Sequence, residues 1–292
     1  MSRGKFVNMN DGATLAFLIP FASRKLKSHW TIACRHLRQT LRSIHNSSSG
    51  NYRVVVAGHE SPDFDVRFDS RFNFLSLTHP VPSDRNYTPA LVLDKLTKIA
   101  AAWNYAKPTW NPKYVMKLDA DDLISSKLVE WLDNADGEAG YLIKNGWVWR
   151  SGSRYLLQRT EYFDRTCGSC LIIRNDVVDQ TGPFLAEWEG VPSEEASSSS
   201  AASNGHSVPG YRTSTILLND SCPRFAAQFA YLGHRLPTVP FTAVVYRTGN
   251  SDSVEGEIHQ RTPQTQTLRM FIGRIRRTRL ITKALRKEFM LG

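Results

Sequence analysis

Apolar and polar residues follow each other along the chain in blocks that predict buried strands separated by helices. Four short apolar blocks bounded by turn residues are typical of buried strands. Two longer segments repeat their apolar residues at helical spacing. The expected strands are 15–21, 52–57, 72–77 and 114–118, and the expected helices are 29–45, capped by Ser28, and 90–105. This order predicts an α/β fold with a mostly parallel central sheet.

The second half of the chain continues with shorter elements and one strong break in composition. The expected elements are a helix at 126–134, strands within 141–157 and at 167–174, a helix at 213–232 and a strand at 241–246. Between them, about residues 192–209, the chain is rich in serine and alanine, which predicts a flexible loop. A loop of this length is either a lid over a site or an excursion without a role.

The net charge of +10 is concentrated at the C-terminus. Residues 264–292 carry eight Lys or Arg residues and one Glu, a net charge of +7. The rest of the chain has 29 basic and 26 acidic residues and is nearly balanced. Apolar residues alternate with the basic ones in 264–291, which predicts a basic amphipathic helical tail on an anionic membrane surface or packed on the domain. We therefore expect a domain at 1–255 and a tail at 256–292.

Composition excludes several classes of protein. A hydrophobic content of 41% is ordinary for a globular chain, and no apolar run approaches the roughly 18 residues that span a bilayer. The cysteines Cys34, Cys167, Cys170 and Cys222 do not suggest a secreted disulfide framework, and a structural role is favoured for the Cys-x-x-Cys pair. The N-terminal apolar run is short and is followed by Arg24, Lys25 and Lys27, which favours a first core strand over a signal peptide, so we expect a cytoplasmic protein. No nucleic-acid-binding signature is present, so we do not expect binding to nucleic acid.

Three carboxylates follow one apolar strand closely. In Lys113–Ser126 the apolar residues lead directly to Asp119, Asp121 and Asp122. Carboxylates packed this closely repel one another unless a cation or hydrogen-bond donors lie nearby, and Mg²⁺ or Mn²⁺ takes oxygen ligands of this kind. The alternative is a turn in which Asp122 or Ser125 caps the following helix.

The order of parts resembles that of GT-A glycosyltransferases, close to family 2. The Asp-x-Asp motif at the end of its strand is the most specific part of the resemblance. The other parts are Ile19-Pro20, Glu60, Asp94-Lys95, Gly168-Ser169-Cys170, Leu232-Gly233-His234 and Val244-Val245-Tyr246, and the likeness covers about residues 13–255.

The resemblance implies a site for a nucleotide-sugar donor and a divalent metal. Pro20, Ser23, Glu60, Lys95 or Lys98, and Asp119 would border the nucleotide. Asp121 would be the main ligand of Mn²⁺ or Mg²⁺, and Asp122 would assist it. The family usually supplies a third ligand, often His, from the loop after the late strand. In Arg247–Ser253 there is no His, and Asp252 is the nearest substitute.

The resemblance also implies a base that deprotonates the acceptor. Asp220 lies where the family places that base, and Glu187 and Glu189 are rivals. The aromatic residues Trp147, Trp149 and Tyr155 would either stack on an acceptor sugar or pack in the core.

We therefore expect a metal-dependent glycosyltransferase of the hexosyltransferase type, active in surface polysaccharide or glycoconjugate synthesis. It would use a nucleotide sugar, of the UDP type, and a saccharide or lipid-linked acceptor, with the tail at the cytoplasmic face of a membrane. One alternative is a nucleotidyltransferase that makes sugar nucleotides, although the loop after the first strand lacks glycine. Another is a non-catalytic basic protein that binds nucleic acid or membrane.

Overall fold

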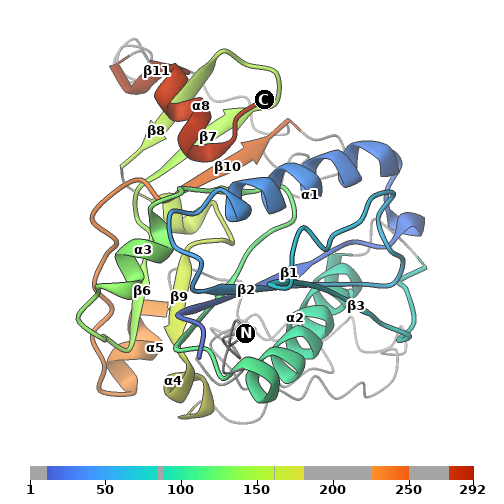
Figure 1. The fold of residues 1–292 in the computed structure, drawn as a ribbon, viewed down its shortest axis with the longest axis horizontal. Coiled ribbons are helices and arrows are strands. Elements are labelled where there is room, and N and C mark those ends of the chain that lie inside the picture. The colour runs from blue at the N-terminus through green and yellow to red at the C-terminus, as the bar shows by residue number, and fades with distance from the viewer. Residues whose placement is uncertain (1–11, 84–87, 161, 181–224, 250–275) are drawn as a thin grey trace, which may run out of the picture.

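The computed structural model describes residues 12–83, 88–160, 162–180, 225–249 and 276–292 (Figure 1). Within these ranges the chain forms two sheets with helices packed around them. The expected flexible loop and the first part of the tail lie outside the described residues. No helix in the described ranges is long and apolar enough to cross a membrane.

The central sheet has six strands in the order β3-β2-β1-β4-β9-β6. Their bounds are β1 Leu15–Pro20, β2 Tyr52–Gly58, β3 Phe72–Ser76, β4 Tyr114–Lys117, β6 Gly140–Leu142 and β9 Leu171–Arg174. The first four strands pair in parallel, and β9 runs antiparallel to both β4 and β6. The expected α/β fold with a mostly parallel central sheet is confirmed.

Helices cover both faces of this sheet. α1 (Trp30–His45) lies on one face and α2 (Thr88–Trp110) on the other (Figure 1). Ser28 does not cap α1, because His29 is the capping residue and it makes no side-chain cap hydrogen bond.

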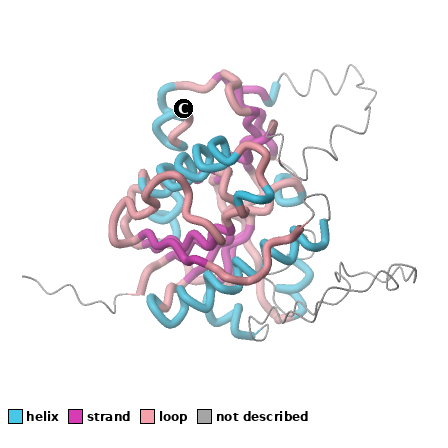
Figure 2. The backbone as a smooth tube through the Cα atoms, turned by 90° about the vertical axis from the view of Figure 1, so that its right-hand side faces the viewer, coloured by secondary structure: helices cyan, strands magenta, loops and turns pink. Residues whose placement is uncertain are grey.

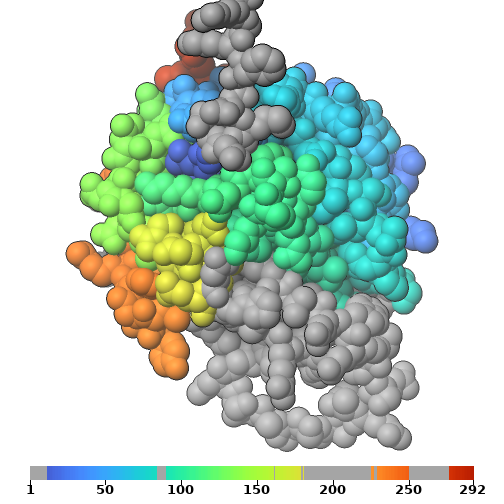
Figure 3. All heavy atoms as spheres, turned by 60° about the horizontal axis from the view of Figure 1, so that its bottom comes forward, coloured from blue at the N-terminus to red at the C-terminus, as the bar shows by residue number. Residues whose placement is uncertain are grey.

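Shorter helices complete the molecule. They are α3 (Leu128–Asp133), α4 (Asn175–Gln180) and α5 (Phe225–Tyr231), with single 3₁₀ turns η1 (Arg24–Leu26) and η2 (Phe163–Arg165). Figure 3 shows α2 in green, α4 in yellow and α5 in orange on one face of the molecule. Phe225 and Phe229 of α5 are fully buried in the main core, so this helix packs against the sheet.

The second sheet has five strands in the order β11-β8-β7-β10-β5. Their bounds are β5 Leu123–Ile124, β7 Gly146–Arg150, β8 Tyr155–Arg159, β10 Val244–Thr248 and β11 Thr278–Leu280. β5 follows the acidic residues directly and pairs antiparallel with β10. The chain therefore passes from the central sheet to the second sheet through residues 119–122.

The end of the chain packs on the domain. After β11 it forms the helix α8 (Lys283–Phe289). Ile281, Phe289 and Leu291 are buried in a second core, shared with Leu123, Trp147, Trp149, Leu156 and Val245. Polar contacts reinforce this packing, because Ser125 Oγ donates to Glu288 Oε1 at 2.6 Å and Asn46 Nδ2 donates to the Lys287 carbonyl at 2.7 Å. For residues 276–292, the structure therefore agrees with a tail packed on the domain and adds an unexpected strand.

Replacement of Phe289 tests whether the end of the chain completes the second core. We expect Phe289→Ala to lower the free energy of unfolding by about 3–5 kcal/mol, because it leaves a cavity between the sheet and α8. Urea denaturation measures this change. The neighbouring variant Met290→Ala, at a residue 36% exposed, should change stability by less than about 0.5 kcal/mol. Equal effects of the two substitutions would contradict this packing.

Candidate functional site

The acidic stretch forms a tight turn at the carboxyl edge of the central sheet. The Asp122 N–H donates to the Asp119 carbonyl at 3.1 Å, which closes the turn between β4 and β5. Asp119 and Asp121 are half-buried and Asp122 is fully buried. The expected turn is therefore present, but neither Asp122 nor Ser125 is the N-cap of α3, which is Lys127. The turn places two partly exposed carboxylates at the sheet edge where ligands bind in α/β proteins.

The carboxylate of Asp122 points into the protein and accepts three hydrogen bonds. Ser169 Oγ donates to Oδ2 at 2.7 Å and Cys167 Sγ donates to the same oxygen at 3.3 Å. The Arg247 backbone N–H donates to Oδ1 at 3.2 Å. Burial raises the pKa of Asp122 well above its usual range, as do the charges of Asp121 and Asp119, while the bonds from Ser169 and Arg247 lower it. Asp122 thus connects three segments in the interior: the acidic turn, the residues before β9 and strand β10.

Arg247 holds the turn from the second sheet. Its Nε donates to the Asp121 carbonyl at 2.9 Å, and its guanidinium lies 4.8 Å from the ring centre of Trp149. Burial lowers the pKa of Arg247, and the charges of Asp121 and Asp122 oppose that effect. Arg247 was expected in a polar loop, but it is buried and lies in β10, whose pairing with β7 continues to Thr248.

Helix α1 holds the same turn from the other side. Gln39 Oε1 accepts from Arg247 Nη2 at 2.7 Å, and Thr40 Oγ1 donates to the Ala120 carbonyl at 3.0 Å. The Ser43 hydroxyl accepts from the Ile124 N–H at 3.1 Å. The sequence pattern marked α1 as amphipathic, but it did not distinguish these polar residues from solvent-facing ones.

Asp119 lies beside a lysine and a close backbone segment. Lys95 Nζ is 3.0 Å from Asp119 Oδ1, and the Asp119 N–H donates to Ser169 Oγ at 2.9 Å. A Cβ atom at Gly168 would lie 2.9 Å from Asp119 Oδ2, so any larger residue there would displace the carboxylate. The structure thus brings together Lys95 and Asp119, as expected for two residues of one site.

Glu60 binds the segment that follows β1. Ser23 Oγ donates to Glu60 Oε1 at 2.9 Å, and the Arg24 N–H donates to Oε2 at 3.1 Å. Ser23 is fully buried, and Pro20 at the end of β1 is half-buried. The structure therefore brings together Ser23 and Glu60, two of the residues expected to border a nucleotide.

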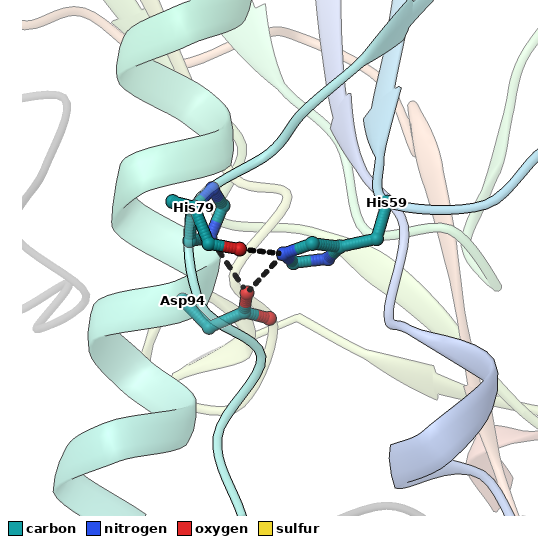
Figure 4. Close-up of side chains that lie close together, drawn as sticks. All are labelled: His59, His79 and Asp94. Atoms are coloured by element: carbon teal, nitrogen blue, oxygen red, sulfur yellow. Dashed lines mark hydrogen bonds and ion pairs between the residues drawn. The ribbon is translucent and has the colours of Figure 1, made fainter.

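Two histidines and an aspartate meet beside this edge (Figure 4). His79 Nε2 lies 3.0 Å from Asp94 Oδ1, and His59 Nε2 lies 2.9 Å from the His79 carbonyl. Among the described residues, these three side chains are the only group of at least three His, Cys, Asp or Glu whose ligand atoms all lie within 4.8 Å of one another. Their spacing alone would suit a metal ion.

The cation beside Asp94 is Lys98, which donates to Asp94 Oδ2 and is 1% exposed. Burial raises the pKa of Asp94, but the hydrogen bond from His79 and the charge of Lys98 outweigh it, and the resulting pKa is lowered. Burial, followed by the charge of Lys98, lowers the pKa of His59. Since a lysine neutralises the carboxylate and His59 Nε2 contacts a carbonyl, we interpret this group as a structural network.

The expected metal ligands do not converge. Asp122 does not fit a metal at the sheet edge, because both of its oxygens accept hydrogen bonds in the interior. Asp119 pairs with Lys95. Asp121 is partly exposed, and one protein carboxylate with phosphate oxygens and water can hold Mg²⁺ or Mn²⁺.

The remaining expected site residues either lie outside the described residues or belong to the second core and its surface. Asp252, Asp220, Glu187 and Glu189 lie outside the described residues. Trp147 and Trp149 are buried in the second core, which is the packing alternative, whereas Tyr155 is 54% exposed. Within the described residues, Cys34, Cys167 and Cys170 are buried and not in a disulfide, which agrees with a structural role.

No family model and no curated protein sequence matches the chain. Among solved structures, it is similar to S. aureus TarS residues 1–349, with a TM-score of 0.45 and 12% identity over 80% of this chain and 60% of that chain. A second S. aureus TarS structure gives a TM-score of 0.44 and 12% identity over 82% of this chain and 37% of that chain. The chain thus spans less than two thirds of either structure, and the likeness concerns the arrangement of elements.

Replacement of Lys98 tests the structural interpretation of the histidine group. We expect Lys98→Met to lower the free energy of unfolding by about 3–5 kcal/mol, because it leaves the Asp94 carboxylate buried without its cation. Chemical denaturation measures the loss. Adding Asp94→Asn should restore part of it, and Lys144→Met, at an exposed lysine, should be nearly neutral. Thermal stabilisation of the unaltered protein by stoichiometric Zn²⁺ or Co²⁺ would contradict this interpretation.

Proposed function

We propose that the chain is a glycosyltransferase that moves a sugar from a nucleotide-sugar donor to a saccharide or lipid-linked acceptor. The observation that carries this proposal is the presence of two contacting pairs of residues at the carboxyl edge of the sheet. Ser23 and Glu60 join the ends of β1 and β2, and Lys95 of α2 meets Asp119 after β4. These are the positions at which the resemblance to GT-A enzymes implies contacts with a nucleotide.

The residues of this edge suit the different parts of a sugar nucleotide. Glu60 and Asp119 offer acceptors for ribose and base donors, and Lys95 offers a positive charge for phosphate. Asp121 would hold a Mn²⁺ or Mg²⁺ ion against the diphosphate, and the ion would stabilise the charge that grows on the leaving group. Asp122 would position Asp119 and Asp121 from the interior. A uridine nucleotide is the expected donor.

The Glu60 contacts favour a glycosyltransferase over a nucleotidyltransferase. A nucleotidyltransferase would direct the backbone N–H groups after β1 at a phosphate. In this chain the Arg24 N–H donates to the Glu60 carboxylate at 3.1 Å. A phosphate at that N–H would meet a carboxylate of the same charge, which disfavours this alternative.

The acceptor side of the reaction requires a base that deprotonates the acceptor hydroxyl. Asp220 is the proposed base, with Glu189 as its rival. A lipid-linked acceptor would require contact with a membrane.

Substitutions at Asp121 and Glu60 test the proposed donor site. We expect isothermal titration with UDP-, GDP-, CMP- and dTDP-sugars in the presence of Mn²⁺ to show binding of one donor type. Asp121→Asn should weaken that binding by about tenfold or more, since it removes the charge that holds the ion. It should also remove most of the difference between titrations with Mn²⁺ and with a chelator. Glu60→Gln should weaken binding with and without the ion.

The matched control is Asp136→Asn, at an exposed aspartate after α3. It should bind the donor as the unaltered protein does. Absence of binding for every sugar nucleotide would overturn the proposal, and so would equal affinities for the Asp121, Glu60 and Asp136 variants.

A further inference from the structure

One end of the molecule is strongly basic. β7, β8, β11 and α8 lie together at that end in Figure 1, and Figure 2 shows the C-terminus at the same end of the molecule. We call residues 146–160 and 276–292, which contain these elements, the basic module. The module has exposed basic side chains at Arg150, Arg154, Arg276, Arg277, Arg279, Lys283, Arg286 and Lys287. Its one acidic residue is Glu288.

The single acid does little to neutralise this surface. Glu288 is half-buried, accepts from Ser125 Oγ at 2.6 Å and lies 3.4 Å from Lys127 Nζ, which is outside the module. Arg279 Nη1 donates to the Thr278 carbonyl at 3.1 Å and to the Arg276 carbonyl, so these contacts leave its charge unpaired with an acid. The module therefore presents a positive potential to solvent.

Exposed apolar side chains lie among these charges. Tyr155 of β8 and Leu280 of β11 are directly opposite each other in the antiparallel pair, so both side chains project from the same face of the ribbon. They are 54% and 57% exposed. Of the six large hydrophobic side chains exposed in the described chain, Tyr155, Leu280 and Met290 belong to this module.

We propose that the basic module binds the surface of a membrane that contains anionic phospholipids. Each Lys or Arg near such a surface gains electrostatic attraction, and tyrosine and leucine enter the boundary between headgroups and acyl chains. A purely electrostatic partner, such as a nucleic acid, would use the basic residues but would gain little from a leucine exposed beside a tyrosine. The pair Tyr155–Leu280 is therefore the feature that favours lipid.

The module can meet a membrane without distorting the proposed donor site. Its inner side is the second core, where Trp149, Phe289 and Leu291 are buried. The acidic turn is joined to that core through Arg247, whose guanidinium lies over Trp149 and whose Nε donates to the Asp121 carbonyl. The inference does not depend on the proposed function, although a lipid-linked acceptor would connect the two.

Sedimentation with vesicles tests the inference on the full chain. The probes are vesicles of pure phosphatidylcholine and vesicles in which a quarter of the lipid is phosphatidylglycerol. We expect binding to the anionic vesicles only, and release as salt is added. The variant Arg279→Glu/Arg286→Glu should weaken that binding by about tenfold or more, since both charges are reversed. The variant Tyr155→Ser/Leu280→Ser should weaken it several-fold while the dependence on salt remains.

The control Ile32→Ser/Arg35→Glu changes one exposed apolar and one exposed basic residue of α1. It should bind as the unaltered protein does, and circular dichroism should show that all variants are folded. Equal binding to both kinds of vesicle, or no effect of the module variants, would overturn the inference. The inference would also be overturned if the protein bound duplex DNA as tightly as anionic vesicles and the Tyr155→Ser/Leu280→Ser variant bound the vesicles as tightly as the unaltered protein. Titration of a sugar nucleotide without vesicles reports separately on the proposed function.

Discussion

The buried carboxylate of Asp122 is the interaction on which the site depends. It accepts bonds from Ser169 before β9 and from the backbone of Arg247 in β10, and it is itself part of the turn after β4. A carboxylate removed from water is costly unless donors surround it, so these contacts favour one arrangement of three segments. Because β9 belongs to the central sheet and β10 to the second sheet, this one side chain joins the two sheets at the candidate site.

The buried contacts of Asp122 also position the partly exposed charged residues of the sheet edge. Ser169 Oγ donates to Asp122 and accepts from the Asp119 N–H, so the same hydroxyl fixes both ends of the turn. Asp119 then meets Lys95, and Asp121 stays at the surface of the turn. A rigid turn of this kind preorganises charged groups for a ligand, which reduces the entropy lost when the ligand binds.

The sequence pattern predicted the elements that are determined by the spacing of apolar residues within a short segment. The apolar blocks around Phe17, Val55 and Val115 predicted three of the parallel strands, and the helical repeat predicted α1 and α2. The position of Asp119 after a strand predicted its place at the sheet edge. These features depend only on residues close together in the chain.

The features that sequence reasoning missed depend on contacts between distant residues. β5 has only two residues and shows no pattern of its own. Asp122 was expected to assist a metal, but its orientation depends on Ser169 and Arg247, which lie 47 and 125 residues away. The strand β11 forms because the tail adds to the edge of β8, which a helical pattern in the tail could not indicate.

Unfolding of Asp122→Asn in urea, without metal or nucleotide, tests the role of Asp122 most directly. If the buried contacts of Asp122 hold the three segments together, the free energy of unfolding falls by about 1–3 kcal/mol. The reason is that the donors now bind two carboxylate oxygens, whereas the amide of asparagine offers only one acceptor oxygen. If the variant is as stable as the unaltered protein, the buried contacts of Asp122 do not hold the three segments together, and this account of the site is wrong.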